Sequence, residues 1–292
     1  MKKLLRNYSL VIGRKVCDSF LGLKLNKYFN IARLSLKERL TYRGDFLFSS
    51  FLRFLPMITS ILLWKSVYSS SEQESLSGFS FKQVIAYLLL VNISRMFSSM
   101  PGLATNLARD VREGSIKKYL LQPIDLIGYL ISYRIAHKAA YISTSLVPYI
   151  ILFGSCASFF DTFPTPVGCA YFVLSLMLAF VIGFYFEVCL GMLSFWILEV
   201  TSLLYVVTTL SFFLSGHLIP LDLLDTTGWL DVLKNLPFAY LAYFPAAIFL
   251  QKISDEELLL RFLIGVLWAL FFYLLSRVIL YFGLRKYSAY GA

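Results

Sequence analysis

Six long apolar stretches, separated by short polar ones, dominate the sequence of 292 residues. A helix needs about 20 apolar residues to cross the ~30 Å hydrocarbon core of a membrane, and each stretch is close to that length or longer. The expected spans are residues 46–68, 84–107, 136–160, 167–197, 202–219 and 258–282. The pattern predicts an all-α integral membrane protein with six transmembrane helices. A more polar stretch before residue 136 is expected at the membrane interface.

Prolines and polar residues mark the ends of these spans. Residues 69–80 are rich in serine, and residues 161–166 carry two prolines, which interrupt a helix. Residues 216–257 hold several glycines and prolines between short apolar pieces. We expect broken helices packed on protein in that stretch, and no seventh span.

Composition supports the membrane class. Apolar residues make up 58% of the chain and charged residues 15%, against roughly 45–50% and about 25% in soluble domains. Mean hydropathy is +0.71. Soluble globular, collagen-like and disordered classes are excluded. The four cysteines show no CxxC spacing and the two histidines lie far apart, so no metal site is expected.

The positive charge, +10 overall, is distributed as in an oriented membrane protein. Of the 27 lysines and arginines, 19 lie in residues 1–44, 108–138 and 283–292, which share one side in the six-span topology. The loops on the opposite side hold three lysines. Because cytoplasmic loops carry the excess of Lys and Arg, both termini are predicted to be cytoplasmic. This placement argues against a nucleic-acid partner.

Two regions follow from this topology: a cytoplasmic N-terminal segment, residues 1–44, and a six-helix transmembrane domain, residues 45–292. Residues 26–43 mix cations with apolar side chains. That mixture is typical of a helix lying in the inner interface, against anionic membrane lipids. The alternative is a soluble helix packed on a partner.

Motifs of nucleotide binding and hydrolysis are missing from the sequence. It contains no GxxxxGK[ST], HExxH or GxSxG. We therefore expect no catalytic residues, no enzyme activity and no cofactor bound by this chain.

Charged residues within or beside the spans are candidates for a transport path or for pairing between helices. A charge costs ~2.5–3.5 kcal/mol at a helix centre. Glu187 lies deep in the fourth span, Glu199 is expected at a cytoplasmic turn, and Arg95 lies in the second span. Arg53 and Arg277 also suit snorkelling to the headgroups.

Residues 109–126 connect the second and third spans and combine charged with apolar side chains. A short amphipathic helix on the cytosolic side suits docking into a partner's groove, although a plain surface loop is the alternative. Gly114 is expected to take φ > 0 at the turn, and Pro123 to stop the helix. The candidate docking residues are Arg112, Glu113, Gly114, Ile116, Lys117, Leu120, Leu121 and Pro123, with Ile116, Leu120 and Leu121 as the apolar anchor.

These residues resemble the cytosolic connector of ABC exporter permeases of the second class, the ABC-2-type permeases. Four further motifs agree in order. They are Ser194-Phe195-Trp196, Ser215-Gly216-His217-Leu218-Ile219-Pro220-Leu221, Leu236-Pro237-Phe238 with Tyr243-Phe244-Pro245-Ala246, and the ending from Gly283 to Gly291. The resemblance covers roughly residues 30–292. The extension at residues 1–29 is longer than the family pattern.

The resemblance implies an interfacial N-terminal helix, six spans and short re-entrant helices before the last one. It implies a permease that pairs with a second permease, identical or homologous, and with two ATPase subunits, which hold ATP and Mg. Residues 109–126 would be the coupling helix that ATP binding moves. The cargo would be a hydrophobic small molecule of drug or toxin type, or a lipid or glycan. The location would be the bacterial inner membrane.

Two other classes stay open on the sequence. One is an intramembrane lipid-modifying enzyme, which would use Glu187 or His217 as its chemical group. The other is a membrane anchor or receptor that transports nothing. A neighbouring gene for a P-loop ATPase would favour the exporter over both.

Overall fold

A computed structural model gives the fold of the chain. The structure describes residues 29–30, 33, 37, 52, 55–70, 75–76, 78–121, 124–160, 163–197, 199–224 and 230–287. The predicted interfacial helix at residues 26–43 falls almost entirely outside these residues, as do Arg53 and Pro123.

The described residues are mostly helical. The long helices are α3 (Leu55–Ser70), α4 (Phe81–Ser98), α5 (Leu103–Arg112), α7 (Leu126–Ser155), α8 (Pro166–Met192), α9 (Thr201–Leu214) and α12 (Asp255–Lys286). The short ones are α6 (Lys117–Leu120), α10 (Leu230–Asn235), α11 (Tyr243–Phe249) and the 3₁₀ turns η1 (Ala157–Phe159), η2 (Leu193–Phe195), η3 (Leu221–Leu224) and η4 (Ala239–Leu241). Strands β1 (Ser75–Leu76) and β2 (Phe79–Ser80) form an antiparallel hairpin.

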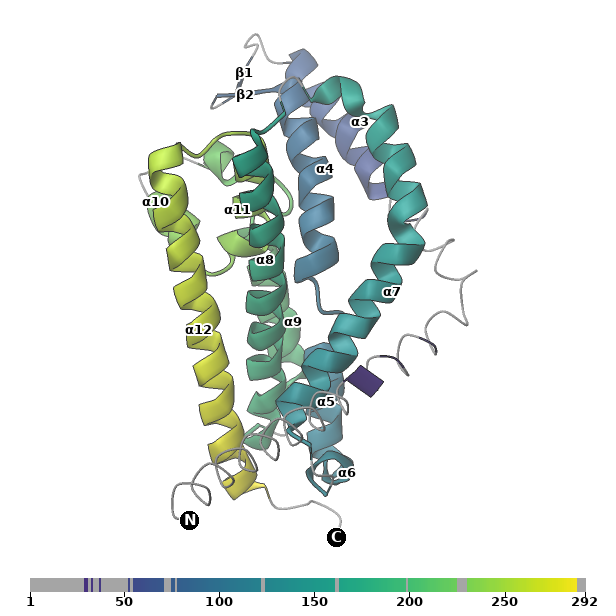
Figure 1. Cartoon of the computed structure of the whole chain (residues 1–292), viewed down its shortest axis with the longest axis vertical. Coiled ribbons are helices and arrows are strands. Elements are labelled where there is room, and N and C mark those ends of the chain that lie inside the picture. The colour runs from purple at the N-terminus through teal and green to yellow at the C-terminus, as the bar shows by residue number, and fades with distance from the viewer. Residues whose placement is uncertain are drawn as a thin grey trace, which may run out of the picture.

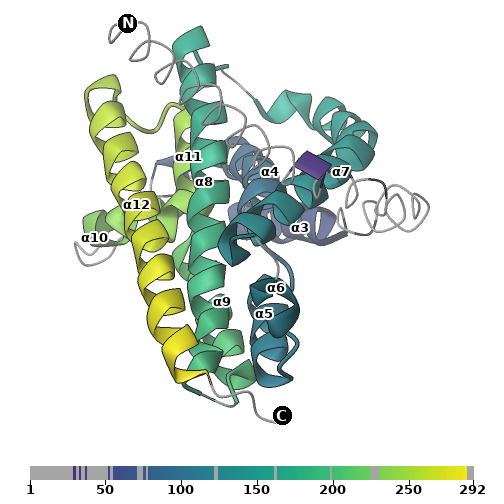
Figure 2. The same cartoon turned by 60° about the horizontal axis from the view of Figure 1, so that its bottom comes forward.

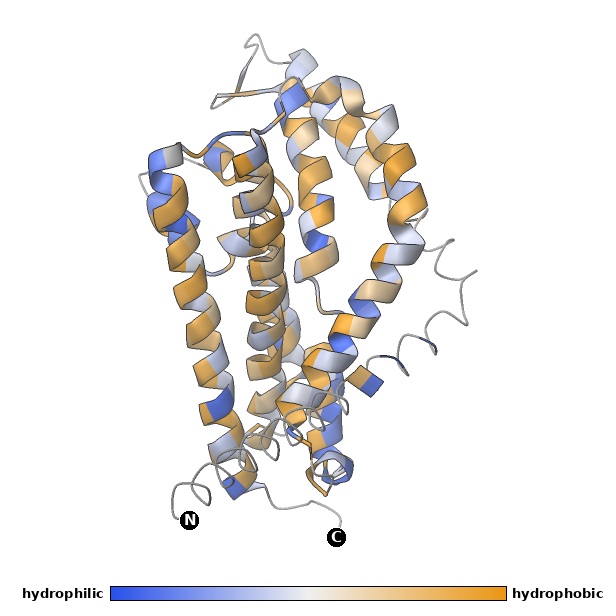
Figure 3. Cartoon of the chain, viewed as in Figure 1, coloured by the Kyte–Doolittle hydropathy of each residue, from blue (hydrophilic) through white to orange (hydrophobic). Residues whose placement is uncertain are grey.

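Helix α8 is the centre of the bundle. It packs against α12, α4, α5 and α11, and Figure 1 shows α12 on one side of it and α4 on the other, with α7 slanting away. Figure 2 brings the end that carries α5 and α6 forward. Hydrophobic residues follow α8 and α12 along most of their length, and hydrophilic ones gather near the ends (Figure 3).

Four helical stretches of the described chain are long and apolar enough to cross a membrane: Phe81–Arg112, Leu126–Ser155, Pro166–Phe195 and Glu256–Lys286. The fifth expected span corresponds to α9, which is apolar but has only 14 residues. The first corresponds to α3, with 16 residues. An all-α membrane protein is therefore supported, and the count of six spans stays a prediction.

The second expected span, residues 84–107, lies within the stretch Phe81–Arg112 but is not the one continuous helix that had been expected. Helix α4 ends at Ser98, and α5 begins at Leu103. Pro101 has no backbone N–H to continue the helix, and Gly102 takes φ +73°, a conformation that glycine adopts at little cost. The result is a discontinuous helix whose two ends meet inside the bundle.

The stretch before residue 136 is helical, and its expected place at the membrane interface stays a prediction. Helix α7 runs without interruption from Leu126, because Asp125 caps its first turn by accepting a hydrogen bond from the N–H of Gly128 at 2.8 Å. Arg134 within this stretch and Lys138 just after it are buried. They face the break between α4 and α5.

The described residues between 216 and 254 form short helices, as the glycines and prolines predicted. Tyr240 and Tyr243 are buried there, and the N–H of Tyr243 bonds to the carbonyl of Ser215 at 3.0 Å. Gly216 has φ +77°, and its carbonyl accepts a bond from the hydroxyl of Tyr87 on α4 at 2.6 Å. These contacts fix the segment to the core of the bundle.

The hairpin β1–β2 and the turn before α12 come together at one end of the molecule. Lys252 donates to the carbonyl of Gly78 at 2.9 Å and to the side-chain oxygen of Gln83 at 3.2 Å. Its ammonium group lies 4.4 Å from the ring centre of Phe79. Loops far apart in the sequence therefore close this end of the bundle.

Candidate functional site

The end of α4 at the break is held by two cations from α7. Lys138 donates to the carbonyl oxygen of Met96 at 2.5 Å and also to that of Ser99. Arg134 donates to the carbonyl of Pro101 at 3.2 Å. Carbonyls at a helix C-terminus lack partners within the helix and carry partial negative charge. Lys138 satisfies two such carbonyls at the end of α4, and Arg134 satisfies the carbonyl of Pro101 within the break.

An acidic side chain from α8 faces the start of α5. The carboxyl group of Glu187 interacts with the backbone N–H of Ala104, in the first turn of α5, and with the charge of Arg134. The cap residue Gly102 makes no side-chain hydrogen bond of its own. Glu187 therefore faces the start of α5 from a neighbouring helix, where the partial positive charge of a helix N-terminus favours a carboxylate.

Two glycines one turn on either side of Glu187 allow this approach. A side chain at Gly183 would collide with the carbonyl oxygen of Ser98. A side chain at Gly191 would lie 2.9 Å from the carbonyl oxygen of Ala104. The backbone of the break therefore lies directly against α8.

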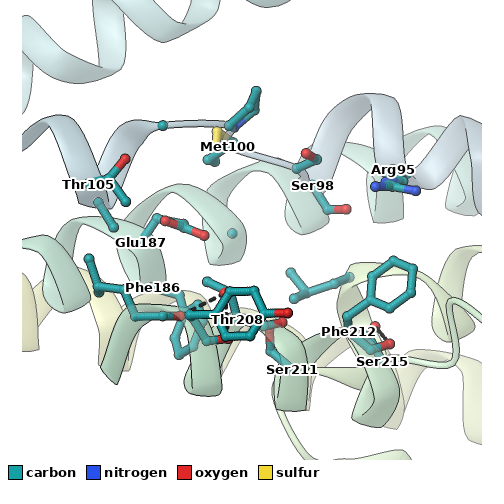
Figure 4. A pocket seen from close by; sticks show the side chains of 18 of the residues that line it. Arg95, Ser98, Met100, Thr105, Phe186, Glu187, Thr208, Ser211, Phe212 and Ser215 are labelled. Atoms are coloured by element: carbon teal, nitrogen blue, oxygen red, sulfur yellow. Dashed lines mark hydrogen bonds between the residues drawn. The ribbon is translucent and has the colours of Figure 1, made fainter. Parts of the chain in front are cut away.

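A cavity of ≈ 410 Å³ lies beside the break, between α4–α5, α8 and α9. Figure 4 shows Glu187 and Thr105 toward one end and Arg95, Phe212 and Ser215 toward the other. The face of α9 that lines it has helical spacing and many hydroxyl groups. Its residues are Thr201, Leu204, Tyr205, Thr208, Ser211 and Phe212, and Ser215 follows directly after the helix.

Arg95 lines this cavity and a second one of ≈ 340 Å³ on the α7 side, which also includes His137, Lys138 and Tyr141. Its guanidinium carbon lies 5.2 Å from the ring centre of Phe212 on α9, within the range of a cation–π interaction. Arg95 therefore stands between the two cavities.

The predicted connector does not form the single helix expected over residues 109–126. Helix α5 ends at Arg112, Gly114 turns the chain with φ +74°, as predicted, and α6 follows as a single turn. Ile116 is fully buried beneath this turn, beside Val111 and Leu126. The expectation that Ile116 anchors a partner was therefore wrong: it attaches the connector to its own bundle.

The other two anchor candidates are exposed. Leu120 is 40% exposed and Leu121 86%, and Lys117 and Lys118 beside them are exposed as well. Lys118 lies 3.9 Å from the carboxylate of Asp110. The connector thus presents an apolar pair among cations.

Glu199 lies at the turn before α9, where the sequence placed it, and pairs with Arg112 at the end of α5 at 3.2 Å. Hydrogen bonds from Thr201, with a smaller effect of Arg112, lower the pKa of this carboxyl group below its usual range. The exposed Glu113 follows Arg112. The end of α5 is therefore tied to the start of α9.

Arg277 on α12 is also paired. It donates to Asp125, the residue that caps α7, at 2.6 Å. The sequence left open whether Arg277 pairs with another side chain or snorkels to the headgroups. In the structure it pairs with Asp125.

In the sequence, Arg134 and Lys138 stand out only among the positive charges that orient the protein in the membrane. Their role at the break was not predicted. Two signals were present. The two residues are four apart on one face of an otherwise apolar helix, and Pro101-Gly102 interrupts a predicted span. Neither signal says which helix end the cations would meet.

A family model described as ABC-2 family transporter protein matches residues 54–291 of the chain. The match includes every helix from α3 to α12 described above. No curated protein matches the chain.

Proposed function

Because the chain belongs to the ABC-2 family of transporters, we propose that it is the permease subunit of an ATP-driven exporter. It would move a hydrophobic small molecule, a lipid or a glycan across the bacterial inner membrane. Separate ATPase subunits would bind ATP and Mg and supply the energy, since the sequence holds no nucleotide-binding motif.

The observation that carries this proposal is the path from an exposed connector to the cavity beside the break. Helix α5 has Ala104 and Thr105 at the cavity and Arg112 at the connector. Its 10 residues span ~15 Å as one rigid element. A push on the connector would therefore be transmitted along α5 to the cavity wall.

The partner at the connector would be an ATPase, with a groove that takes the apolar pair Leu120 and Leu121. Such docking concentrates its energy in a few buried side chains. Lys117 and Lys118 would act at the rim, where single charges contribute mainly to association rate.

The proposed assembly has two ATPases and two permeases, identical or homologous, with six spans in each permease and both termini in the cytoplasm. Helix α9 exposes an apolar face opposite the cavity, formed by Leu203, Val206, Leu210 and Phe213. That face suits lipid or the second permease.

Affinity purification of the tagged chain from its host membrane tests the proposal. The expected result is a co-purified P-loop ATPase whose ATP hydrolysis depends on the permease. Leu121→Asp should abolish this association, because a buried apolar anchor is often worth more than ~2 kcal/mol. Val232→Asp is the matched control: Val232 is 52% exposed and lies on α10, at the other end of the bundle (Figure 1). No ATPase with the wild-type chain, or equal loss in both variants, would refute the proposal.

A further inference from the structure

The cavity between α4–α5, α8 and α9 has an acidic side chain toward one end and a basic side chain toward the other. Glu187 lies toward one end and Arg95 toward the other (Figure 4). The remaining described lining residues include neither Asp nor Lys. A purely cationic or purely anionic ligand would meet a like charge at one end, which costs affinity.

The spacing of these charges follows from the helix geometry. Gly183 lies against Ser98, so α8 and α4 are level at this point. Arg95 lies three residues before Ser98, and Glu187 lies four residues after Gly183. The two helices run in the same direction (Figure 1), so seven residues of helical rise separate the two charged positions by ~10 Å along the axis. Three residues of extended peptide cover the same ~10 Å.

The hydroxyl groups between the two charges are arranged as acceptors. Thr208 donates its hydroxyl proton to the carbonyl of Leu204 at 2.7 Å, and Ser211 donates to that of Thr208 at 2.8 Å. A hydroxyl that donates within its own helix still offers oxygen lone pairs to a ligand. The α9 face can therefore accept hydrogen bonds from N–H groups of a bound molecule.

Aromatic rings complete the lining. Phe186, Tyr205 and Phe212 contribute apolar surface, and a volume of ≈ 410 Å³ lies within the usual range of small-molecule sites. The carboxylate of Glu187 has about four acceptor positions, so its interaction with the N–H of Ala104 leaves room for an ammonium group.

We propose that this cavity binds an elongated zwitterion with apolar side groups, with the chemistry of a short apolar peptide that has free ends. Its ammonium group lies at Glu187, its carboxylate at Arg95, and its amide N–H groups along the hydroxyls of α9. The inference rests on the proposed function only for the step from bound ligand to exported cargo.

Binding of labelled phenylalanyl-alanyl-phenylalanine to the full-length permease in uncharged detergent tests the site. Unlabelled peptides with an acetylated N-terminus, an amidated C-terminus or both serve as competitors. Blocking either end should weaken binding about tenfold or more, because each removes a charge-assisted hydrogen bond.

Charge-removing variants assign each end of the peptide to its residue. In Glu187→Gln, acetylation should have little further effect while amidation still weakens binding. In Arg95→Gln the pattern should be reversed, as in a double-mutant cycle. The Gln at position 187 keeps an acceptor for the N–H of Ala104. Glu256→Gln and Arg285→Gln, at residues that do not line the cavity, should keep the wild-type pattern.

Equal competition by the free and the doubly blocked peptide would overturn the inference, as would the lack of saturable binding to the wild-type chain. The wild-type competition series decides this even if a variant fails to fold. Because the assay uses the permease alone, a negative result would not count against the proposed association with an ATPase. Likewise, if no ATPase co-purifies, the measured peptide binding remains valid.

Discussion

Lys138 on α7 donates a hydrogen bond from its ammonium group to the carbonyl oxygen of Met96, in the last turn of α4, at 2.5 Å. Across the break, Glu187 on α8 faces the first turn of α5 through the N–H of Ala104. Each charge has the sign that the adjacent helix end favours. An interrupted helix within an apolar bundle exposes backbone groups that need partners, and these side chains supply them.

Removing the ammonium group of Lys138 should destabilise the protein. Lys138→Met keeps the apolar stem but leaves the carbonyls of Met96 and Ser99 without this donor, a loss of about 1.5–3 kcal/mol. Thermal unfolding in detergent measures it. Lys82→Met, at an exposed site in the first turn of α4, should change stability by less than ~0.5 kcal/mol. Equal melting temperatures of wild type and Lys138→Met would contradict the capping role.

Gly183 should not tolerate a methyl group. In Gly183→Ala the new carbon would collide with the backbone carbonyl of Ser98, and overpacking of this kind costs about 1–3 kcal/mol. Gly154, on α7, has no atom within 4 Å of such a carbon. Gly154→Ala should therefore be neutral or slightly stabilising. Comparison of the two unfolding temperatures is the measurement, and an unaffected Gly183→Ala would show that α4 and α8 are not in contact there.

Asp125 has two roles that substitutions separate. Asp125→Ala loses the cap of α7 and the ion pair with Arg277, whereas Asp125→Ser keeps a capping oxygen and loses only the pair. The cap is worth ~1 kcal/mol and the half-exposed pair less than ~1 kcal/mol. We expect the alanine variant to be the less stable, and the serine variant to match Arg277→Met. If alanine and serine prove equal in unfolding measurements, Asp125 does not cap α7.

The contribution of Glu199 should depend on pH. Hydrogen bonds from Thr201, assisted by Arg112, lower its pKa in the folded state below the ordinary value of 4.5. A lowered folded pKa means that the stabilisation is fully present above the unfolded pKa and is lost as pH falls through the folded one. The difference in melting temperature between wild type and Glu199→Gln should therefore shrink below about pH 4.5. A difference that stays constant or grows on acidification would argue against these bonds.

Much of the fold could be predicted from the sequence because apolar length and turn residues are local signals. The boundaries of α8 and α12 lie close to the expected spans, since Pro166 and the polar residues near Ser254 mark where those helices begin. Gly114 was placed at a turn with positive φ for the same local reason.

The parts that the sequence did not predict depend on contacts between distant segments. Ile116 has the same apolar character as Leu121, and only the packing of α6 on the bundle buries one and exposes the other. The partners of Lys138 and Glu187 are backbone groups of the α4–α5 break. Backbone groups carry no residue-specific signal, so this site could not be assembled from the sequence.

A photo-crosslinking residue at position 121, compared with the same residue at position 232, tests the central claim most directly. In intact cells, position 121 should give an adduct with a P-loop ATPase, because the proposed ATPase docks on the exposed connector. Position 232 should give none, because α10 lies at the opposite end of the bundle. An ATPase adduct at 232, or none at 121 in a strain that expresses the ATPase, would contradict the account.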